Sequence, residues 1–184
     1  MKRQVVVGIT GASGAVYAQH LLAKLAAQTA TEVAVVFTDN GKQVFRYELG
    51  EEALREITFQ QYDNNNFFAP FASGSSSFDT LMIIPCSMGT LAKVTTGLAS
   101  DLISRTADVM LKEGRRLIVV PRETPYNLIH LRNMVQLQEA GGVICPACPS
   151  FYSKPTRLEE VIDTVVDRVL QLAGFKTEAY QWGK

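Results

Sequence analysis

The chain has 184 residues, of which 47% are hydrophobic and 20% charged, and this composition predicts one globular domain, 1–184, with a full apolar core. Its 18 basic residues balance its 18 acidic residues, which argues against binding to nucleic acid or to an anionic membrane surface. No apolar run is long enough to span a bilayer, no signal peptide is evident, and three cysteines are too few for a disulfide scaffold. We therefore expect a cytoplasmic protein.

Buried strands alternate with amphipathic helices in the N-terminal half. Residues 5–9 form a short β-branched run that is typical of a buried parallel strand, and residues 32–37 repeat the pattern. Between these runs, residues 13–27 carry apolar side chains at helical spacing. Two short helices at 41–49 and 51–57 and a third strand at 81–84 are also predicted.

The same alternation continues to the C-terminus. Strands are predicted at 116–120 and 143–145, and helices at 88–95, 101–113, 128–140 and up to about 172. The last helix is predicted to begin with a capping box at Thr156-Arg157-Leu158-Glu159. This order predicts an α/β fold with a doubly wound parallel sheet, whose ligands bind beyond the carboxyl ends of the strands.

A loop of small residues, 8–14, joins the first strand to the first helix. It would let a ligand approach the backbone near a helix N-terminus, which favours a nucleotide or a flavin. A tight turn that needs glycine is the alternative explanation. Asp39 stands about where a dinucleotide site has its ribose-binding carboxylate, so an NAD-dependent dehydrogenase also remains possible at this point.

Polar residues also follow two later strands. The segment 85–90 offers hydroxyl and N–H groups at a strand-to-helix turn, although Ser87 could simply be the N-cap of the next helix. Arg122 and Glu123 come directly after the strand that ends at Pro121. They are either part of a site or a surface ion pair.

Charged residues on two predicted helices have different interpretations. Arg168 lies at the edge of an apolar face formed by Leu158, Val161, Val165, Val169 and Leu172, so it either binds an anion or extends to solvent. On the helix at 101–113, the i, i+4 spacing predicts two ion pairs on a solvated face. These pairs are Asp101–Arg105 and Asp108–Lys112.

Cys145 and Cys148 match a C-x-x-C pattern, but neither a redox role nor a metal role is expected. No helix is predicted to begin there, and a second cysteine pair for zinc is missing. We expect no metal site in this chain.

Several motifs occur together in a characteristic order. They are Gly11-Ala12-Ser13-Gly14, Ala72-Ser73-Gly74-Ser75, Pro85-Cys86-Ser87-Met88-Gly89-Thr90, the helix from Arg105 to Glu113, Pro121-Arg122-Glu123-Thr124-Pro125 and Phe151-Tyr152. With this ordered set the chain resembles the UbiX family of flavin prenyltransferases over nearly its whole length.

The resemblance implies a three-layer, flavodoxin-like Rossmann fold and a homododecamer with active sites at subunit interfaces. It implies transfer of a dimethylallyl group from dimethylallyl phosphate to N5 and then C6 of reduced FMN, with release of phosphate and without a metal. The product, prenylated FMN, would serve a UbiD-type decarboxylase. Whether the donor is the monophosphate or the pyrophosphate stays open.

The resemblance also assigns residues. Those implied to bind FMN are Gly11, Ala12, Ser13, Thr38, Ser87, Met88, Gly89, Thr90, Arg105 and Arg122. Those implied to surround the donor phosphate are Lys112, Arg122, Glu123, Tyr152 and Arg168. The implied catalytic residues are Ser13, Glu48, Lys112 and Glu123. Glu48 is expected to have a raised pKa and to help proton transfer, and Phe67 or Phe68 to shield the allyl cation.

Three departures from the family pattern stand at Thr38-Asp39, Phe67-Phe68 and residues 114–116. The alternatives are an FMN-dependent cysteine decarboxylase, whose characteristic Pro-Ala-Ser-Ala-Asn-Thr segment is absent, and a non-catalytic flavin-binding subunit. The intact set of Lys112, Glu123, Tyr152 and Arg168 favours an active enzyme.

Overall fold

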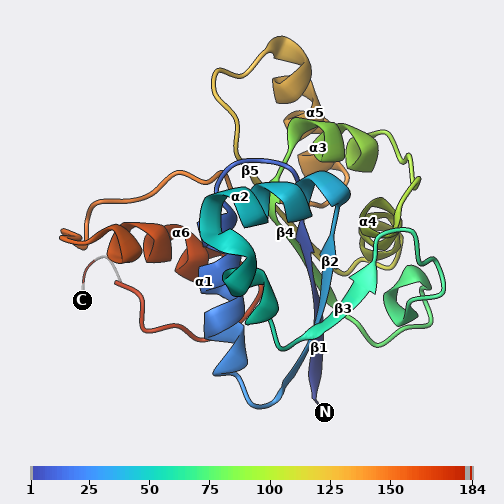
Figure 1. The fold of residues 1–184 in the computed structure, drawn as a ribbon. Helices are drawn as coiled ribbons and strands as arrows, with labels where there is room; N and C mark the ends of the chain where they lie inside the picture. Colours follow the sequence, from blue (N-terminus) through green and yellow to red (C-terminus); the bar gives the residue numbers. More distant parts are fainter. Residues whose placement is uncertain (1, 181–182, 184) are drawn as a thin grey trace.

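Six parallel strands form the centre of the molecule in the computed structural model, which describes residues 2–180 and 183 (Figure 1). They are β1 (Arg3–Ile9), β2 (Thr31–Phe37), β3 (Gln60–Asp63), β4 (Thr80–Cys86), β5 (Arg116–Pro121) and β6 (Val143–Ile144). Their order in the sheet is β3-β2-β1-β4-β5-β6, and every pair is parallel. The chain reverses its direction of winding between β1 and β4, so the predicted doubly wound sheet is confirmed.

Helices cover both faces of this sheet (Figure 1). One face carries α1 (Ala15–Ala26), α2 (Asp39–Arg55) and α6 (Leu158–Leu172), and the other carries α3 (Met88–Thr95), α4 (Leu102–Lys112) and α5 (Leu128–Glu139). A short 3-10 helix, η1 (Pro70–Ala72), packs beside α4. Because side chains alternate along a strand, Val5 and Val7 join the core under α1, while Val6 joins the core under α4. The result is the expected three-layer arrangement.

The predicted elements are found within a few residues of their expected ends, but the sequence did not predict β3. β3 is an edge strand with no buried residue and no apolar run, so it gives no periodic signal. The two short helices expected at 41–49 and 51–57 form one element, α2, with a break at Gly50, where φ is 88°. The break falls between the two predicted helices.

The capping box of α6 is one residue away from its predicted place. The carboxylate that reaches back is that of Glu160, which accepts hydrogen bonds from the N–H groups of Thr156 (2.8 Å) and Arg157 (3.3 Å). Arg157, not Thr156, is the N-cap residue. The prediction with Glu159 was therefore wrong, because two acidic residues stand side by side at this helix start.

The two ion pairs predicted for α4 were also wrong. Asp101 is the buried N-cap of this helix and pairs with Lys93 on α3 at 2.7 Å. Arg105 instead pairs with Asp108 at 2.6 Å, and Lys112 pairs with its neighbour Glu113. One oxygen of the Asp101 carboxylate accepts from the N–H and the hydroxyl of Ser104, and the other accepts from Lys93, so capping occupies the carboxylate that was expected to pair with Arg105.

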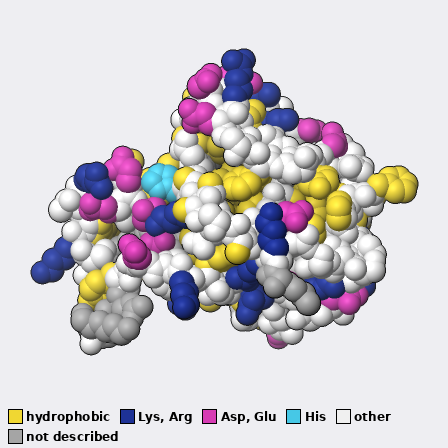
Figure 2. All heavy atoms as spheres, turned by 90° about the horizontal axis from the view of Figure 1, so that it is seen from below, with side chains coloured by type: hydrophobic (Ala, Val, Ile, Leu, Met, Phe, Trp, Pro, Cys, Tyr) yellow, Lys and Arg dark blue, Asp and Glu magenta, His cyan; other side chains and the backbone are white. Residues whose placement is uncertain are grey.

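Charges of both signs are interspersed on the surface, as Figure 2 shows for the face seen from below Figure 1. This distribution agrees with the balanced composition. Among the helices that the structure describes, none has the length and apolar character needed to cross a membrane.

Candidate functional site

The turn after β1 is joined to the turn after β4 by Thr10. Its side chain is buried; Oγ1 donates to the carbonyl oxygen of Pro85 at 2.9 Å and accepts from the N–H of Ser87 at 2.8 Å. The two segments predicted to hold FMN therefore lie together at the carboxyl edge of the sheet. The sequence interpretation missed Thr10, whose only signal was a hydroxyl at the end of a buried strand.

Glycine in the loop after β1 is required by packing and by backbone conformation. A Cβ on Gly11 would lie 2.6 Å from the Cβ of Asn40 on α2, and Gly14 has a φ of 109°. The tight-turn explanation thus accounts for both glycines. It also leaves the backbone of Ala12 and Ser13 at the edge of the sheet, where α1 begins.

Glu48 binds the N-terminus of α1 from its position on α2. Its carboxylate accepts hydrogen bonds from the N–H groups of Gly14 at 3.0 Å and Ala15 at 2.8 Å, and a further one from the Ser13 side chain. Burial acts to raise its pKa, but these hydrogen bonds and the positive charge of Arg122 hold the pKa below the ordinary value for glutamate. The expected raised pKa was wrong for the chain without ligands.

Arg122 completes this group of charges. Its Nε donates to the carbonyl oxygen of Ser13 at 2.9 Å, and its N–H donates to the carbonyl oxygen of Cys86 at 3.2 Å. The structure therefore brings together three of the predicted residues, Ser13, Glu48 and Arg122, which we call the Ser13 cluster. Glu123 lies outside it: it is exposed, and its carboxylate accepts from the N–H of Thr124.

The hydroxyls of Ser87 and Thr38 cap helices. Ser87 Oγ accepts from the N–H of Thr90 at 3.3 Å, and Thr38 Oγ1 accepts from the N–H of Gly41 at 2.9 Å. Thr90 Oγ1 lies 3.1 Å from Ser87 Oγ, and apart from the adjacent residues and backbone of its own helix, nothing lies within 4 Å of where a Cβ on Gly89 would stand. The start of α3 thus combines open space, hydroxyls and a helix N-terminus beside the Ser13 cluster, a combination that suits a phosphate-bearing ligand.

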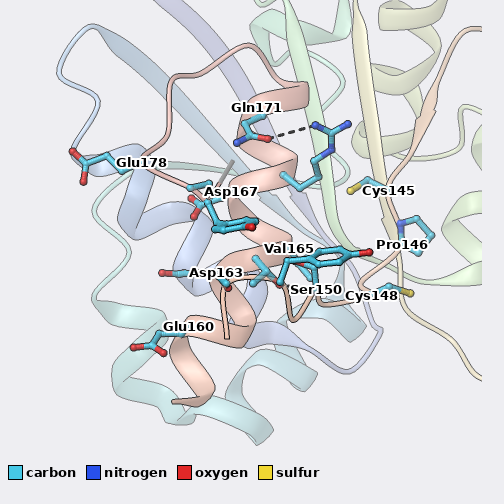
Figure 3. Close-up of a pocket in the computed structure, with 16 residues that line it drawn as sticks. Cys145, Pro146, Cys148, Ser150, Glu160, Asp163, Val165, Asp167, Gln171 and Glu178 are labelled. Atoms are coloured by element: carbon cyan, nitrogen blue, oxygen red, sulfur yellow. Dashed lines mark hydrogen bonds between the residues drawn. The ribbon is translucent and has the colours of Figure 1, made fainter. Parts of the chain in front are cut away.

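A cavity of about 830 Å³ lies against α6 (Figure 3). Its walls come from the segment after β6, from α6 and from the C-terminal residues 178–180, and they include Tyr152 and Arg168. The side chain of Arg168 is exposed and donates to Gln171 Oε1 at 3.4 Å. The structure therefore brings together these two residues of the predicted phosphate group.

The apolar face of α6 differs in part from the predicted one. Leu158 is 70% exposed, which contradicts its predicted place in the core. The residues that pack into the core are Ile162, Val165, Val166, Val169 and Leu170. Arg168 thus extends into the cavity from the solvent side of the helix, and does not lean toward the core.

Two predicted residues lie elsewhere in the chain. Arg105 and Lys112 are on α4, which packs on the opposite face of the sheet from α6 (Figure 1). Arg105 Nε donates to the carbonyl oxygen of Ala72 at 3.0 Å, and Lys112 pairs with Glu113 beside Gly74. Phe67 and Phe68 are exposed, and neither lines the cavity. One copy of the chain therefore does not assemble the whole predicted set.

The cysteines line the cavity or lie in the core. Cys145 and Cys148 contribute to the cavity wall with free thiols, and burial raises the pKa of the Cys145 thiol. No helix begins at this C-x-x-C segment. Within the described residues, no group of three or more histidine, cysteine or acidic side chains could hold a metal ion.

Comparison with known proteins identifies the family. The Flavoprotein family model matches residues 1–170. The flavin prenyltransferase UbiX of Methanocaldococcus jannaschii is 39% identical over 183 residues, which cover 98% of each chain. This chain belongs to the UbiX flavin prenyltransferase family. A second UbiX, from Halalkalibacterium halodurans, is 44% identical over 193 residues, covering 97% of this chain and 92% of the relative.

Solved UbiX structures share the fold over the full length. AnUbiX in complex with FMN and dimethylallyl pyrophosphate has a TM-score of 0.91 and 39% identity, covering 99% of this chain and 100% of its own. A dodecameric FMN-dependent UbiX-like decarboxylase from Escherichia coli O157:H7 has a TM-score of 0.93 and 35% identity, with coverages of 98% and 100%. The cysteine decarboxylase SpaF, at 21% identity and a TM-score of 0.64, shares the fold alone. The resemblance and the prenyltransferase class predicted from the sequence are thus confirmed.

Proposed function

We propose that this UbiX family member transfers a dimethylallyl group from dimethylallyl phosphate to N5 and then C6 of reduced FMN. The observation that carries the proposal is the Ser13 cluster, which places a hydroxyl, a carboxylate and a guanidinium at the carboxyl edge of the sheet. The start of α3 lies next to it and has room for a ligand. This is the edge at which doubly wound sheets bind their ligands.

FMN would be held by the turns after β1, β2 and β4. We assign its polar contacts to the backbone of Gly11–Ser13, to Thr38 and to residues 87–90, with Arg122 closing one side. When bound, reduced FMN supplies the nucleophilic nitrogen. The chain's own contribution is to orient the ring with Ser13, whose hydroxyl Glu48 holds by a hydrogen bond.

The donor phosphate would bind in the cavity against α6. Arg168 and Tyr152 line it, and a fixed positive charge there stabilises the phosphate as it leaves the allyl group. Arg122 of the Ser13 cluster, with Glu123 beside it in the sequence, would contribute from the end of β5. Lys112 and Arg105, and the aromatic surface of Phe67 or Phe68, would come from a second copy of the chain in a homo-oligomer, which we propose to be a dodecamer.

Glu48 has a different role from a base with a raised pKa. Because its pKa is lowered, it is ionised at neutral pH and is a weak proton acceptor in the chain without ligands. We assign it to orienting Ser13 and to stabilising positive charge near the flavin. The departing phosphate, held by Arg168, then receives the proton that is lost from C6.

The product is prenylated FMN, and we propose a UbiD-type decarboxylase in the same compartment, the cytoplasm, as its recipient.

The test is anaerobic incubation of the protein with reduced FMN and dimethylallyl phosphate, followed by mass spectrometry of the flavin. We expect an added five-carbon unit with the wild type, and dimethylallyl pyrophosphate as a parallel donor decides which phosphate is used. Arg168→Ala should retain FMN but lose at least about tenfold in donor affinity, since a hydrogen bond to a charged group is broken. Arg132→Ala, an exposed arginine on α5, is the matched control. An unchanged flavin mass with the wild type would refute the proposal.

A further inference from the structure

Arg168 has a neutral partner, although the cavity that it enters is rich in carboxylates. Four acidic residues line this cavity: Glu160, Asp163, Asp167 and Glu178. The partner to which the Arg168 guanidinium donates is nevertheless the side-chain amide of Gln171, one helical turn further along α6 (Figure 3). Within the part of the chain that the structure describes, this guanidinium forms no ion pair.

Side chains of α1 already bind two of these carboxylates, Asp163 and Asp167 on α6. Asp163 lies 2.9 Å from Nδ1 of His20 and 3.1 Å from Nζ of Lys24, and Asp167 lies 2.6 Å from the same lysine nitrogen. His20 and Lys24 both stand on α1, so these contacts join α6 to α1. Burial acts to lower the pKa of Lys24, but its hydrogen bonds and charge interactions with the two aspartates raise it above the ordinary value for lysine.

Glu160 is likewise occupied elsewhere. It accepts hydrogen bonds from Thr156 and from the backbone and side chain of Arg157 at the start of α6. Its negative charge is therefore used at the helix N-terminus, where it is favourable. Three of the four carboxylates in the cavity wall are thus directed away from Arg168.

Gln171 connects Arg168 to the C-terminal segment. Its Oε1 accepts from Arg168 at 3.4 Å, and its Nε2 donates to Oγ1 of Thr177 at 3.0 Å. Both ends of the amide are used, which fixes its orientation. The segment is anchored where it leaves the helix, because the N–H of Phe175 donates to the carbonyl oxygen of Leu170 at 2.9 Å and its ring packs under Arg3.

A neutral amide suits a guanidinium that must exchange partners. The 3.4 Å hydrogen bond is long, and a phosphate oxygen forms a stronger, charge-assisted one, so an arriving phosphate displaces the amide easily. A carboxylate at position 171 would compete with the phosphate for the same charge. An apolar side chain there would leave Arg168 free to turn to solvent.

We propose that Gln171 is a positioning residue for donor binding, which holds Arg168 in the cavity and links its position to the C-terminal segment through Thr177. The proposal rests on the proposed role of Arg168 as a ligand of the donor phosphate. Residues 178–180 of this segment form part of the cavity wall, so the link also connects phosphate binding to the shape of that wall.

The experiment compares three variants in the steady-state prenylation assay with the complete oligomer. Gln171→Leu removes both hydrogen bonds and should raise KM for dimethylallyl phosphate about threefold, and Gln171→Glu should raise it about fivefold because the carboxylate pairs with Arg168. Thr177→Val should raise it by less than twofold. In all three, kcat and the affinity for FMN should stay within twofold of the wild type. Gln138→Leu, an exposed glutamine on α5, is the control.

A second measurement follows the C-terminal segment directly. Lys176 offers a trypsin site within it, and dimethylallyl phosphate should slow cleavage there in the wild type. Gln171→Leu and Thr177→Val should weaken this protection by the donor. Without the donor, Gln171→Glu should be cleaved at the wild-type rate, because its carboxylate can accept from the Thr177 hydroxyl. A purely structural role for Gln171 would instead lower kcat, FMN affinity and stability together.

Arg168→Ala, measured in parallel, distinguishes a failure of the role proposed for Gln171 from a failure of the phosphate assignment of Arg168. If it weakens donor binding while Gln171→Leu and Gln171→Glu leave KM unchanged, the role of Gln171 is overturned and the proposed function stands. If Arg168→Ala leaves donor binding unchanged, the phosphate assignment and the role of Gln171 both fail. Equal KM values for Gln171→Leu and Gln171→Glu would contradict the competition between carboxylate and phosphate.

Discussion

Replacing Glu48 with glutamine should destabilise the protein in a pH-dependent manner. The carboxylate accepts backbone hydrogen bonds of 3.0 and 2.8 Å at the start of α1 and a further one from Ser13. Glutamine keeps one acceptor oxygen but loses the other and the negative charge that interacts favourably with the helix N-terminus.

The expected loss at pH 7 is about 1 kcal/mol in the free energy of unfolding, the size of a typical N-terminal capping contribution. For a domain of this size it corresponds to a decrease of about 2–4 °C in Tm. Because the pKa of Glu48 is lowered in the folded chain, its contribution is present above the ordinary glutamate pKa, about 4.3, and is lost as the pH falls through the folded-state pKa. The difference between wild type and Glu48→Gln should therefore shrink below about pH 4.

The assay is urea denaturation of the flavin-free protein, followed by circular dichroism between pH 7 and pH 3.5. Glu52→Gln is the matched control, because this carboxylate lies on the same helix, is 79% exposed and has only a 3.8 Å contact with Arg55. Its effect should stay within about 0.5 kcal/mol. A difference for Glu48→Gln that grows as the pH is lowered would refute the reasoning, since it would mean that the folded-state pKa is raised.

Three further predictions concern buried groups. Thr10→Val should cost about 1–3 kcal/mol in urea denaturation, because the partly buried Ser87 N–H loses its partner and the Pro85 carbonyl keeps only the hydrogen bond from the Thr10 N–H; a cost below about 0.5 kcal/mol would contradict this. Gly41→Ala should abolish soluble expression or lower Tm strongly, because its Cβ would clash with the carbonyl at the end of β1, whereas Gly89→Ala, with open space, should fold normally. Cys148 is exposed and should react quickly with a thiol reagent. Cys86 is completely buried, which raises the pKa of its thiol, and it should react only after unfolding. Labelling of Cys86 in the native protein would contradict this.

The strands of the sheet were predictable because strands buried on both faces consist of continuous apolar residues. Strands that are covered on both faces read as continuous apolar runs, and β1, β2, β4 and β5 all do so. The edge strand β3, Gln60–Asp63, contributes only the partly buried Tyr62 to the core, so its mainly polar sequence carried no periodic signal.

The candidate site was predictable only in part. The loops could be placed from strand ends, but Glu48 came from the family resemblance, because a carboxylate in the middle of a helix gives no hint that it binds the start of another helix. Thr10 was missed because its function is to pair two turns that are 75 residues apart in the chain. The ion pairs of α4 failed for a related reason: spacing along a helix gives neighbours, but not which of them is already used as a cap.

The position of α4 and α6 on opposite faces of the sheet has a consequence for the combined effect of two mutant alleles. If Lys112 of one copy and Arg168 of another complete the same site, a chain defective in either residue still supplies the other. Mixing two such inactive chains at random would restore about one quarter of the sites in a closed, symmetric assembly. Two alleles that each fail alone would then complement each other in one cell.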